Sequence, residues 1–275
     1  MSDLHLDFYI NNTNPSGTKM YRAIQRFVDN NTKQEVGDII IMAGDISHYN
    51  TQTQTLIEIL KDRYKEVLFT AGNHEMYLIS GNMKDKYQCV SERRIDELSI
   101  VAETTGAHFL NGDVFEAGGI KVGGSCGWYN LPTKQDILDW NKYTRDSTLI
   151  FNGYPIHAAY GGEVRVPWDT QAFYEQELQK LKNIAEVGCD ILVNHVAQLI
   201  PPLFTVPNAY KNAPSNKFYY TDNYNLIKQS GCSLYVFGHT HDSYEFTRDG
   251  VEAICNPIGY PGENPRSCIK QICMY

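Results

Sequence analysis

The stretch Asp38-Ile-Ile-Ile-Met-Ala-Gly-Asp45 decides the fold of this chain. Residues 38–43 contain a continuous apolar run, which is typical of a strand that is buried on both faces. Gly44 and Asp45 end this run, so a carboxylate comes directly after the strand. Open α/β sheets bind their ligands at the carboxyl ends of their strands, and Asp45 is therefore a candidate site residue.

Three further apolar runs, at residues 66–70, 190–193 and 233–237, predict buried strands that are followed by polar motifs. These motifs are Gly72-Asn73-His74-Glu75, Asn194-His195 and Gly238-His239-Thr240-His241. A fifth motif, Ser2-Asp3-Leu4-His5, lies at the start of the chain. Either upstream residues are missing from the sequence, or the strand before Asp3 is very short. We expect the five motifs to converge at one sheet edge.

The segments between these strands have helical periodicity. Apolar spacing predicts helices at residues 18–30, 54–64, 85–104, 133–148 and 169–187. Residues 114–123 predict a β-hairpin, and Asp249-Gly250 predicts the turn of another. This alternation indicates a layered α/β fold. The 275 residues suffice for one large domain or two small ones, and we interpret residues 1–275 as a single domain.

The motifs are rich in residue types that bind metal ions. In extended backbone, Asp3 and His5 would point to the same side of the chain, as would His239 and His241. Imidazole and carboxylate ligands suit Mn, Fe and Zn, and the lack of a thiolate argues against a structural zinc site. Each motif taken singly is an ordinary turn or helix cap. All five in this order predict a metal site.

The motif set DLH, GD, GNHE, NH and GHTH resembles the calcineurin-like metallophosphoesterase superfamily, from Asp3 to about Tyr260. Two further segments, residues 124–129 and 256–260, resemble parts of bacterial and phage phosphohydrolases. The resemblance implies two packed mixed β-sheets flanked by helices, a four-layer α/β/β/α sandwich. It also implies a hydrolase with two divalent metal ions, of which Mn is the expected one and Fe, Zn, Ni or Mg are alternatives.

The resemblance assigns roles to individual residues. One metal ion would be held by Asp3, His5, Asp45 and His241, and the other by Asp45, Asn73, His195 and His239. His74 would be a catalytic residue beside the substrate phosphate, where it either stabilises charge or protonates the leaving oxygen. Glu75 would orient His74. A hydroxide that bridges the two metals would attack phosphorus.

Several side chains are candidates for contact with the substrate. His48 either lines the pocket or lies on the surface, and Trp128 and Tyr129 either form a pocket wall or pack in the core. Arg145 and Arg165 are weaker candidates for a phosphate contact. Residues 200–222 contain four prolines and indicate a substrate-side loop or a packed surface excursion.

The composition narrows the class of substrate. The net charge of −8 disfavours nucleic acid, so a nuclease is an alternative rather than the preferred function. A protein phosphatase is a second alternative, although Gly44 to Asn50 lacks the DRG of the GDxxDRG motif. A non-catalytic scaffold is disfavoured because His74 and the ligand residues are all present. We expect a small phosphodiester, phosphomonoester or nucleotide as the substrate.

The chain is also expected to work away from membranes. It has no apolar run long enough to span a bilayer, and it opens on charged residues rather than on a signal peptide. The seven cysteines are scattered and form no CxxC pair, which is typical of reduced thiols in a cytoplasmic protein. The sequence leaves the oligomeric state open.

Overall fold

Strands β1 (Ile39–Ala43), β2 (Glu66–Thr70) and β3 (His108–Phe109) form a three-stranded parallel sheet with β2 at its centre. The computed structural model describes residues 1–10, 17–32, 37–157, 163–164, 168–200, 213–264 and 270–274. Ala43 is paired with Thr70, so β1 and β2 end at the same level. The motifs that follow these two strands therefore leave the sheet at one edge.

The second sheet has six strands in the order β10-β11-β9-β8-β5-β4. The four inner strands are parallel, and the two outer strands belong to antiparallel hairpins, which confirms both predicted hairpins. The strands are β4 (Asp113–Ala117), β5 (Ile120–Ser125), β8 (Ile191–Asn194), β9 (Leu234–Phe237), β10 (Tyr244–Arg248) and β11 (Val251–Cys255). A separate two-stranded ribbon is formed by β6 (Ile156–His157) and β7 (Glu163–Val164).

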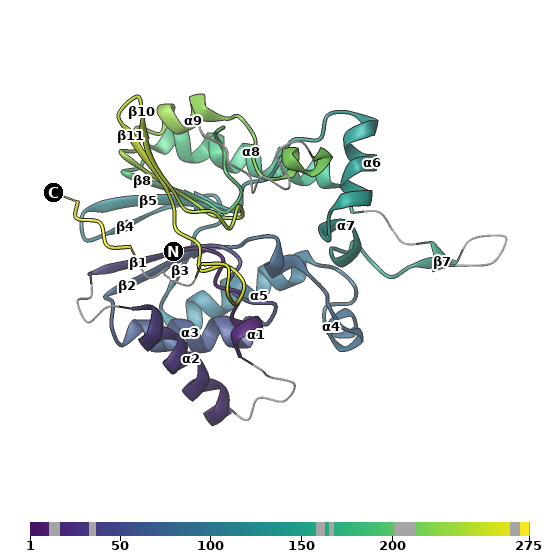
Figure 1. Cartoon of the computed structure of the whole chain (residues 1–275), viewed down its shortest axis with the longest axis horizontal. Helices are drawn as coiled ribbons and strands as arrows, with labels where there is room; N and C mark the ends of the chain where they lie inside the picture. Colours follow the sequence, from purple (N-terminus) through teal and green to yellow (C-terminus); the bar gives the residue numbers. More distant parts are fainter. Residues whose placement is uncertain are drawn as a thin grey trace.

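Helices cover the outer faces of both sheets (Figure 1). The three-stranded sheet is covered by α2 (Gly17–Asn31), α3 (Asn50–Lys61) and α5 (Glu92–Thr105). The six-stranded sheet is covered by α8 (Thr170–Val187) and α9 (Tyr224–Gln229). Between the sheets, Leu68 packs with Val193 and Val236 in one apolar core. The layers therefore follow the order helix, sheet, sheet, helix, as the resemblance implies.

The remaining elements lie at the margins of the sandwich. They are α1 (Leu6–Tyr9), α4 (Gly81–Lys86), α6 (Lys134–Tyr143), α7 (Asp146–Leu149) and the short 3₁₀ turns η1 (His74–Met76) and η2 (Pro214–Phe218). Among the residues that the structure describes, no helix is both long and apolar enough for a membrane span.

Two predicted helices are wrong in their extent. The helix expected at residues 85–104 is divided into α4 and α5, because Gln88 and Cys89 adopt positive φ angles of 52° and 57° between them. The helix expected at 133–148 stops at Tyr143, since Thr144 is extended, and a second helix starts at Asp146. Of the proline-rich loop at 200–222, residues 201–212 lie outside the described part of the chain.

The first residues pair with segments of both sheets. On one side, the amide of Ala43 donates to the carbonyl of Met1 at 2.8 Å, and the amide of Asp3 donates to Gly44 at 3.1 Å. On the other side, Ser2 and Ile258 are joined by a hydrogen bond of 3.0 Å. These hydrogen bonds fix Asp3 between β1 and the residues that follow β11.

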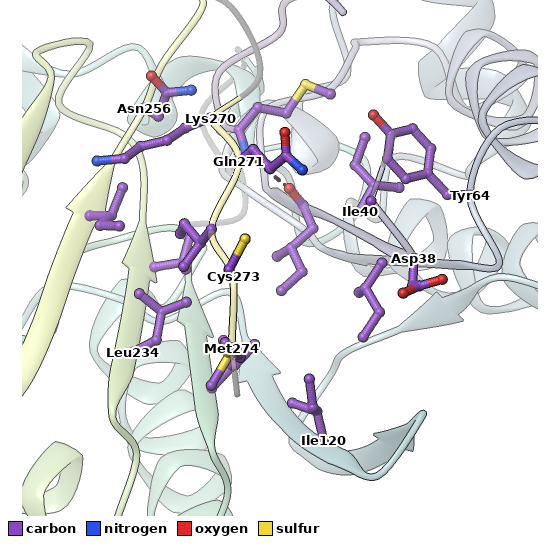
Figure 2. A pocket seen from close by; sticks show the side chains of 18 residues that line it. Asp38, Ile40, Tyr64, Ile120, Leu234, Asn256, Lys270, Gln271, Cys273 and Met274 are labelled. Atoms are coloured by element: carbon purple, nitrogen blue, oxygen red, sulfur yellow. Dashed lines mark hydrogen bonds between the residues drawn. The ribbon is translucent and has the colours of Figure 1, made fainter. Parts of the chain in front are cut away.

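A cavity of about 480 Å³ lies between the two sheets, away from the motifs (Figure 2). Its apolar walls include Ile40 and Leu234, and residues 270–274 pass through it. Strand β9 begins at Leu234, and β1 begins one residue before Ile40. The cavity therefore opens near the amino ends of these strands, whereas the motifs follow their carboxyl ends.

Candidate metal centre

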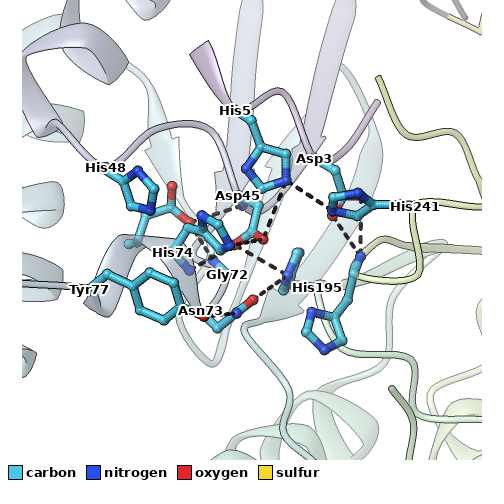
Figure 3. Close-up of polar contacts among 12 residues, drawn as sticks. Asp3, His5, Asp45, His48, Gly72, Asn73, His74, Tyr77, His195 and His241 are labelled. Atoms are coloured by element: carbon cyan, nitrogen blue, oxygen red, sulfur yellow. Dashed lines mark hydrogen bonds and ion pairs between the residues drawn. The ribbon is translucent and has the colours of Figure 1, made fainter. Parts of the chain in front are cut away.

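The strand ends of both sheets bring the predicted ligands together (Figure 3). Asp45 follows β1 and Asn73 follows β2, whereas His195 follows β8 and the pair His239 and His241 follows β9. Two groups of ligand atoms result, and within each group all atoms lie within 4.8 Å of one another. The first group is Asp3, His5, Asp45 and His241, and the second is Asp45, His195 and His239. Asp45 belongs to both groups, which is the arrangement that a pair of neighbouring metal ions needs.

Asn73 faces the second group through its carbonyl oxygen. Its Oδ1 lies 3.1 Å from His195 Nε2. Its amide nitrogen donates to Asp146 Oδ1 and to the hydroxyl of Tyr77, both at 2.9 Å. These two acceptors fix the orientation of the amide, so that the oxygen and not the nitrogen faces the ligand group. Asp146 was not among the predicted site residues.

The ligand residues have unusual backbone conformations. The φ angle is positive at Asp3 (51°), His5 (44°), Asp45 (53°), His239 (70°) and His241 (56°). Left-handed backbone is unfavourable for residues other than glycine, and such strain gathers at functional sites. The expectation of extended backbone for the two pairs is therefore wrong. The backbone turns at each ligand, so His239 and His241 face different groups.

Three of the ligand histidines are oriented through their second ring nitrogen. These contacts are His195 Nδ1 to the carbonyl of Ala43 (2.8 Å), His239 Nε2 to the carbonyl of Phe218 (3.0 Å) and His241 Nδ1 to Glu263 Oε2 (2.7 Å). Metal-binding histidines commonly donate their other ring N–H to a carbonyl or carboxylate, which fixes the tautomer. The donor set and its supporting contacts therefore fit divalent metal ions.

The electrostatics of the site centre on Asp45. Burial alone would raise the pKa of this carboxyl, but the imidazoles of His195 and His74 outweigh it and hold the pKa well below its usual range. Burial would lower the pKa of His195, but Asp45, with Oδ1 at 3.3 Å from Nε2, raises it to about 10. Burial lowers the pKa of His5 to about 4. At neutral pH the metal-free site therefore holds an ion pair of Asp45 and His195 beside the neutral imidazole of His5.

His74 lies beside the ligand groups and belongs to neither of them. Its backbone amide donates to Asp45 Oδ1 at 2.9 Å, and its ring Nε2 lies 3.8 Å from Asp45 Oδ2. Burial is the main reason that the pKa of His74 falls well below its ordinary value. This position allows the imidazole to contact a group that is bound at the metals.

Glu75 has a different role from the expected one. Its buried carboxylate accepts hydrogen bonds from the backbone amides of Gly72 (2.7 Å), Asp45 (3.0 Å), Ile46 (2.8 Å) and Ser47 (3.1 Å). The expectation that Glu75 orients the His74 side chain is thus corrected, because it holds the loop that carries Asp45. Gly72 permits this close approach, since a Cβ atom there would lie 2.2 Å from Asp45 Oδ1.

His48 is part of the site region and is not a surface residue. It is 6% exposed, and its Nδ1 lies 2.6 Å from Asp7 Oδ2. Its ring stacks on that of His74 with 4.7 Å between the centroids. Figure 3 shows His48 on the side of His74 that faces away from His241.

Trp128 and Tyr129 are fully buried. Trp128 packs against Trp168 and Phe173, which favours the core-packing alternative for this residue. The hydroxyl of Tyr129 donates to Asp146 Oδ2 at 2.5 Å, so Tyr129 is connected to Asn73 through that carboxylate. Arg145 is exposed at the start of α7, and Arg165 lies outside the described residues.

Two packed sheets with a buried group of histidine and aspartate ligands at their shared edge define a metal-dependent phosphoesterase. The chain belongs to the calcineurin-like phosphoesterase family, whose model matches residues 1–243. Members of this family bind divalent metals and hydrolyse phosphoesters.

Two individual proteins resemble the chain over nearly its whole length. An uncharacterized protein of Acanthamoeba polyphaga mimivirus is 22% identical over 284 residues, which cover 96% of this chain and 91% of the relative. The crystal structure of a phosphopantetheinyl hydrolase from Mycobacterium tuberculosis is 20% identical and superposes with a TM-score of 0.66. The match covers 97% of this chain and 90% of the hydrolase chain. The second likeness shows the fold.

Proposed function

We propose that the protein is a dinuclear metal-dependent phosphoesterase whose substrate is a small phosphodiester, phosphomonoester or nucleotide. One observation carries this proposal: the two groups of ligand atoms share Asp45, and the His74 imidazole lies 3.8 Å from that carboxylate without joining either group. A site with two metal ions and an adjacent imidazole can bind an anionic phosphoryl group and assist the departure of the leaving oxygen.

The ligand residues divide into two sets in this proposal. Asp3, His5, Asp45 and His241 hold one divalent ion, and Asp45, Asn73, His195 and His239 hold the other. Mn is the expected ion, and Fe, Zn, Ni and Mg are alternatives for this mixture of nitrogen and oxygen ligands. When bound, such ions lower the pKa of water and neutralise charge on phosphoryl oxygens.

The chain's own residues orient the substrate and supply a hydrogen-bond donor. The Nε2 atom of His74 faces Asp45 and can donate to a phosphoryl oxygen or to the leaving oxygen. The backbone hydrogen bond from His74 to Asp45 and the four bonds to Glu75 keep these groups in fixed positions. Such preorganisation means that little reorganisation is needed during the reaction.

The proposed partner is a small phosphorylated molecule. The formal net charge of −8 works against binding of nucleic acid, whose phosphates attract basic surfaces. Gly44 to Asn50 also lacks the DRG that is typical of protein phosphatases. We place the protein in the cytoplasm and treat residues 1–275 as a single catalytic domain.

Hydrolysis of bis(p-nitrophenyl) phosphate and p-nitrophenyl phosphate with added Mn tests this function. The wild type should turn over one of the two esters only when the metal is present. His74→Ala should lower kcat by about 10²–10⁴-fold, the usual contribution of a positioned acid or base, and should still bind Mn. The matched control is His108→Ala, which removes a histidine that pairs with Glu66 on the three-stranded sheet and should leave kcat unchanged.

The outcome also decides between the alternatives. The preferred ester would identify the substrate as a monoester or a diester. A folded wild-type protein that neither binds Mn nor hydrolyses either ester would overturn the proposal and favour a non-catalytic scaffold.

A further inference from the structure

Tyr260 lies beyond residues 1–243, which match the family model, yet its side chain reaches the metal centre. Its ring stacks on the imidazole of His5 with 4.4 Å between the centroids and 22° between the planes. Its hydroxyl lies 3.4 Å from His74 Nε2. Tyr260 therefore contacts both a proposed metal ligand and the proposed catalytic histidine.

The backbone around Tyr260 is fixed to the segments that carry ligands. The amide of Gly259 donates to the carbonyl of Asp3 at 2.8 Å. The amide of Tyr260 donates to Glu263 Oε2 at 2.8 Å, and the same oxygen lies 2.7 Å from His241 Nδ1. The position of the phenol is therefore set by contacts with Asp3 and, through Glu263, with His241, which both belong to the first ligand group.

The Tyr260 hydroxyl lies close to the proposed catalytic histidine and to the first ligand group. His74 Nε2 lies 3.4 Å from the hydroxyl of Tyr260 and 3.8 Å from Asp45 Oδ2. A distance of 3.4 Å is long for an O–H···N hydrogen bond, so the contact with His74 is weak. Tyr260 is partly exposed, and its O–H can turn to a stronger, anionic acceptor.

We propose that the Tyr260 hydroxyl donates a hydrogen bond to a phosphoryl oxygen of the substrate, next to His74, and is thus a further catalytic residue. This inference rests on the proposed function of the site. The stacked ring holds the hydroxyl in place, and the hydroxyl together with His74 forms a pair of hydrogen-bond donors at the edge of the first ligand group.

The test removes the hydroxyl and keeps the ring. Tyr260→Phe should lower kcat for the preferred ester by about ten- to hundredfold, the value of one hydrogen bond to a charged acceptor. In the Mn-loaded protein, its affinity for inorganic phosphate should fall by about tenfold or more, whereas Mn content and melting temperature should not change. The matched control is Tyr21→Phe, which removes a hydroxyl from a tyrosine that is 40% exposed on α2.

Three results would overturn the inference. Turnover and phosphate affinity of Tyr260→Phe within about twofold of the wild type would show that only the ring matters. Loss of Mn from this variant would show that Tyr260 acts on the metal ligands. A wild type that binds no phosphate would leave the hydroxyl with nothing to bind. A wild type that binds phosphate without turnover would contradict the proposed function alone, and the phosphate affinities would still decide the role of Tyr260.

Discussion

The protonation of single side chains determines how the site takes up metal ions. Asp45 raises the pKa of His195 to about 10, so this imidazole carries a proton in the metal-free protein throughout the neutral range. A metal ion needs the unprotonated nitrogen, and binding must release that proton. His5, with a pKa of about 4, is already neutral and releases none.

The affinity for Mn should therefore rise with pH. Between pH 6 and pH 9, below the His195 pKa of about 10, we expect the affinity for the ion held by Asp45, His195 and His239 to increase about tenfold per pH unit, for the one proton that His195 releases. Isothermal titration calorimetry at pH 7 in buffers of different ionisation enthalpy measures the number of protons directly. An affinity that does not change over this range, with no proton released, would show that His195 is neutral before metal binding.

The sequence predicted which side chains lie close together better than it predicted the hydrogen bonds that hold them in position. The seven predicted ligand residues lie close together, and five of them follow strands whose ends are visible as apolar runs. The role of Glu75 could not be predicted, since four backbone amides converge on it only after folding. The role of Asp146 could not be predicted either. Its carboxylate accepts a hydrogen bond from the Asn73 amide, which lies 73 positions away in the sequence.

The break between α6 and α7 places a further buried carboxylate, that of Asp146, next to the candidate metal centre. Because the chain is extended at Thr144, α7 starts anew and places Asp146 among three donors. These donors are the hydroxyls of Tyr77 and Tyr129 and the amide of Asn73. The short helix α7 thus orients Asn73, the proposed ligand that follows β2.

Asp146→Asn should weaken metal binding on the Asn73 side. Asparagine offers one carbonyl oxygen in place of two carboxylate oxygens, so three donors share one acceptor and the Asn73 amide is held less firmly in its orientation. Loss of such a supporting contact typically lowers metal affinity by about 10–100-fold. A Mn titration that resolves both ions should show weakening of one, and Asp62→Asn, at the exposed end of α3, should bind both ions as the wild type does. Equal affinities in the two variants would contradict this role.

Elements with strong local signals were predicted best. The apolar runs of β1, β2, β8 and β9 are confirmed nearly to the residue, because buried parallel strands need continuous apolar sequence. The expected helix at 85–104 failed where local signals are weak. The backbone turns at Gln88 and Cys89 with positive φ, although neither residue type favours that conformation and neither glycine nor proline marks the break.

The metal centre joins parts of the fold that are distant in sequence. Asp45 and Asn73 follow strands of the three-stranded sheet, whereas His195 and His241 follow strands of the six-stranded sheet. Asp3 lies between them on the first residues of the chain, which bond to segments of both sheets. The order of strands within each sheet is not visible in local patterns, and only the family resemblance predicted that two sheets would meet here. Ions at this edge would link the two halves of the sandwich.

Metal binding should therefore stabilise the whole molecule. At a free Mn concentration of 100 times Kd, each filled site adds about 2.7 kcal/mol to the free energy of unfolding. For a chain of 275 residues, that corresponds to a rise in Tm of about 5 °C per site. Calorimetry should show this rise in the wild type and in Asp96→Ala, which removes an exposed carboxylate of α5, and a chelator should reverse it. Asp45→Ala removes the one carboxylate shared by both ligand groups and should abolish the rise. The same rise in Asp45→Ala would mean that Mn stabilises the fold from another place, and that the shared edge of the two sheets is not where the ions bind.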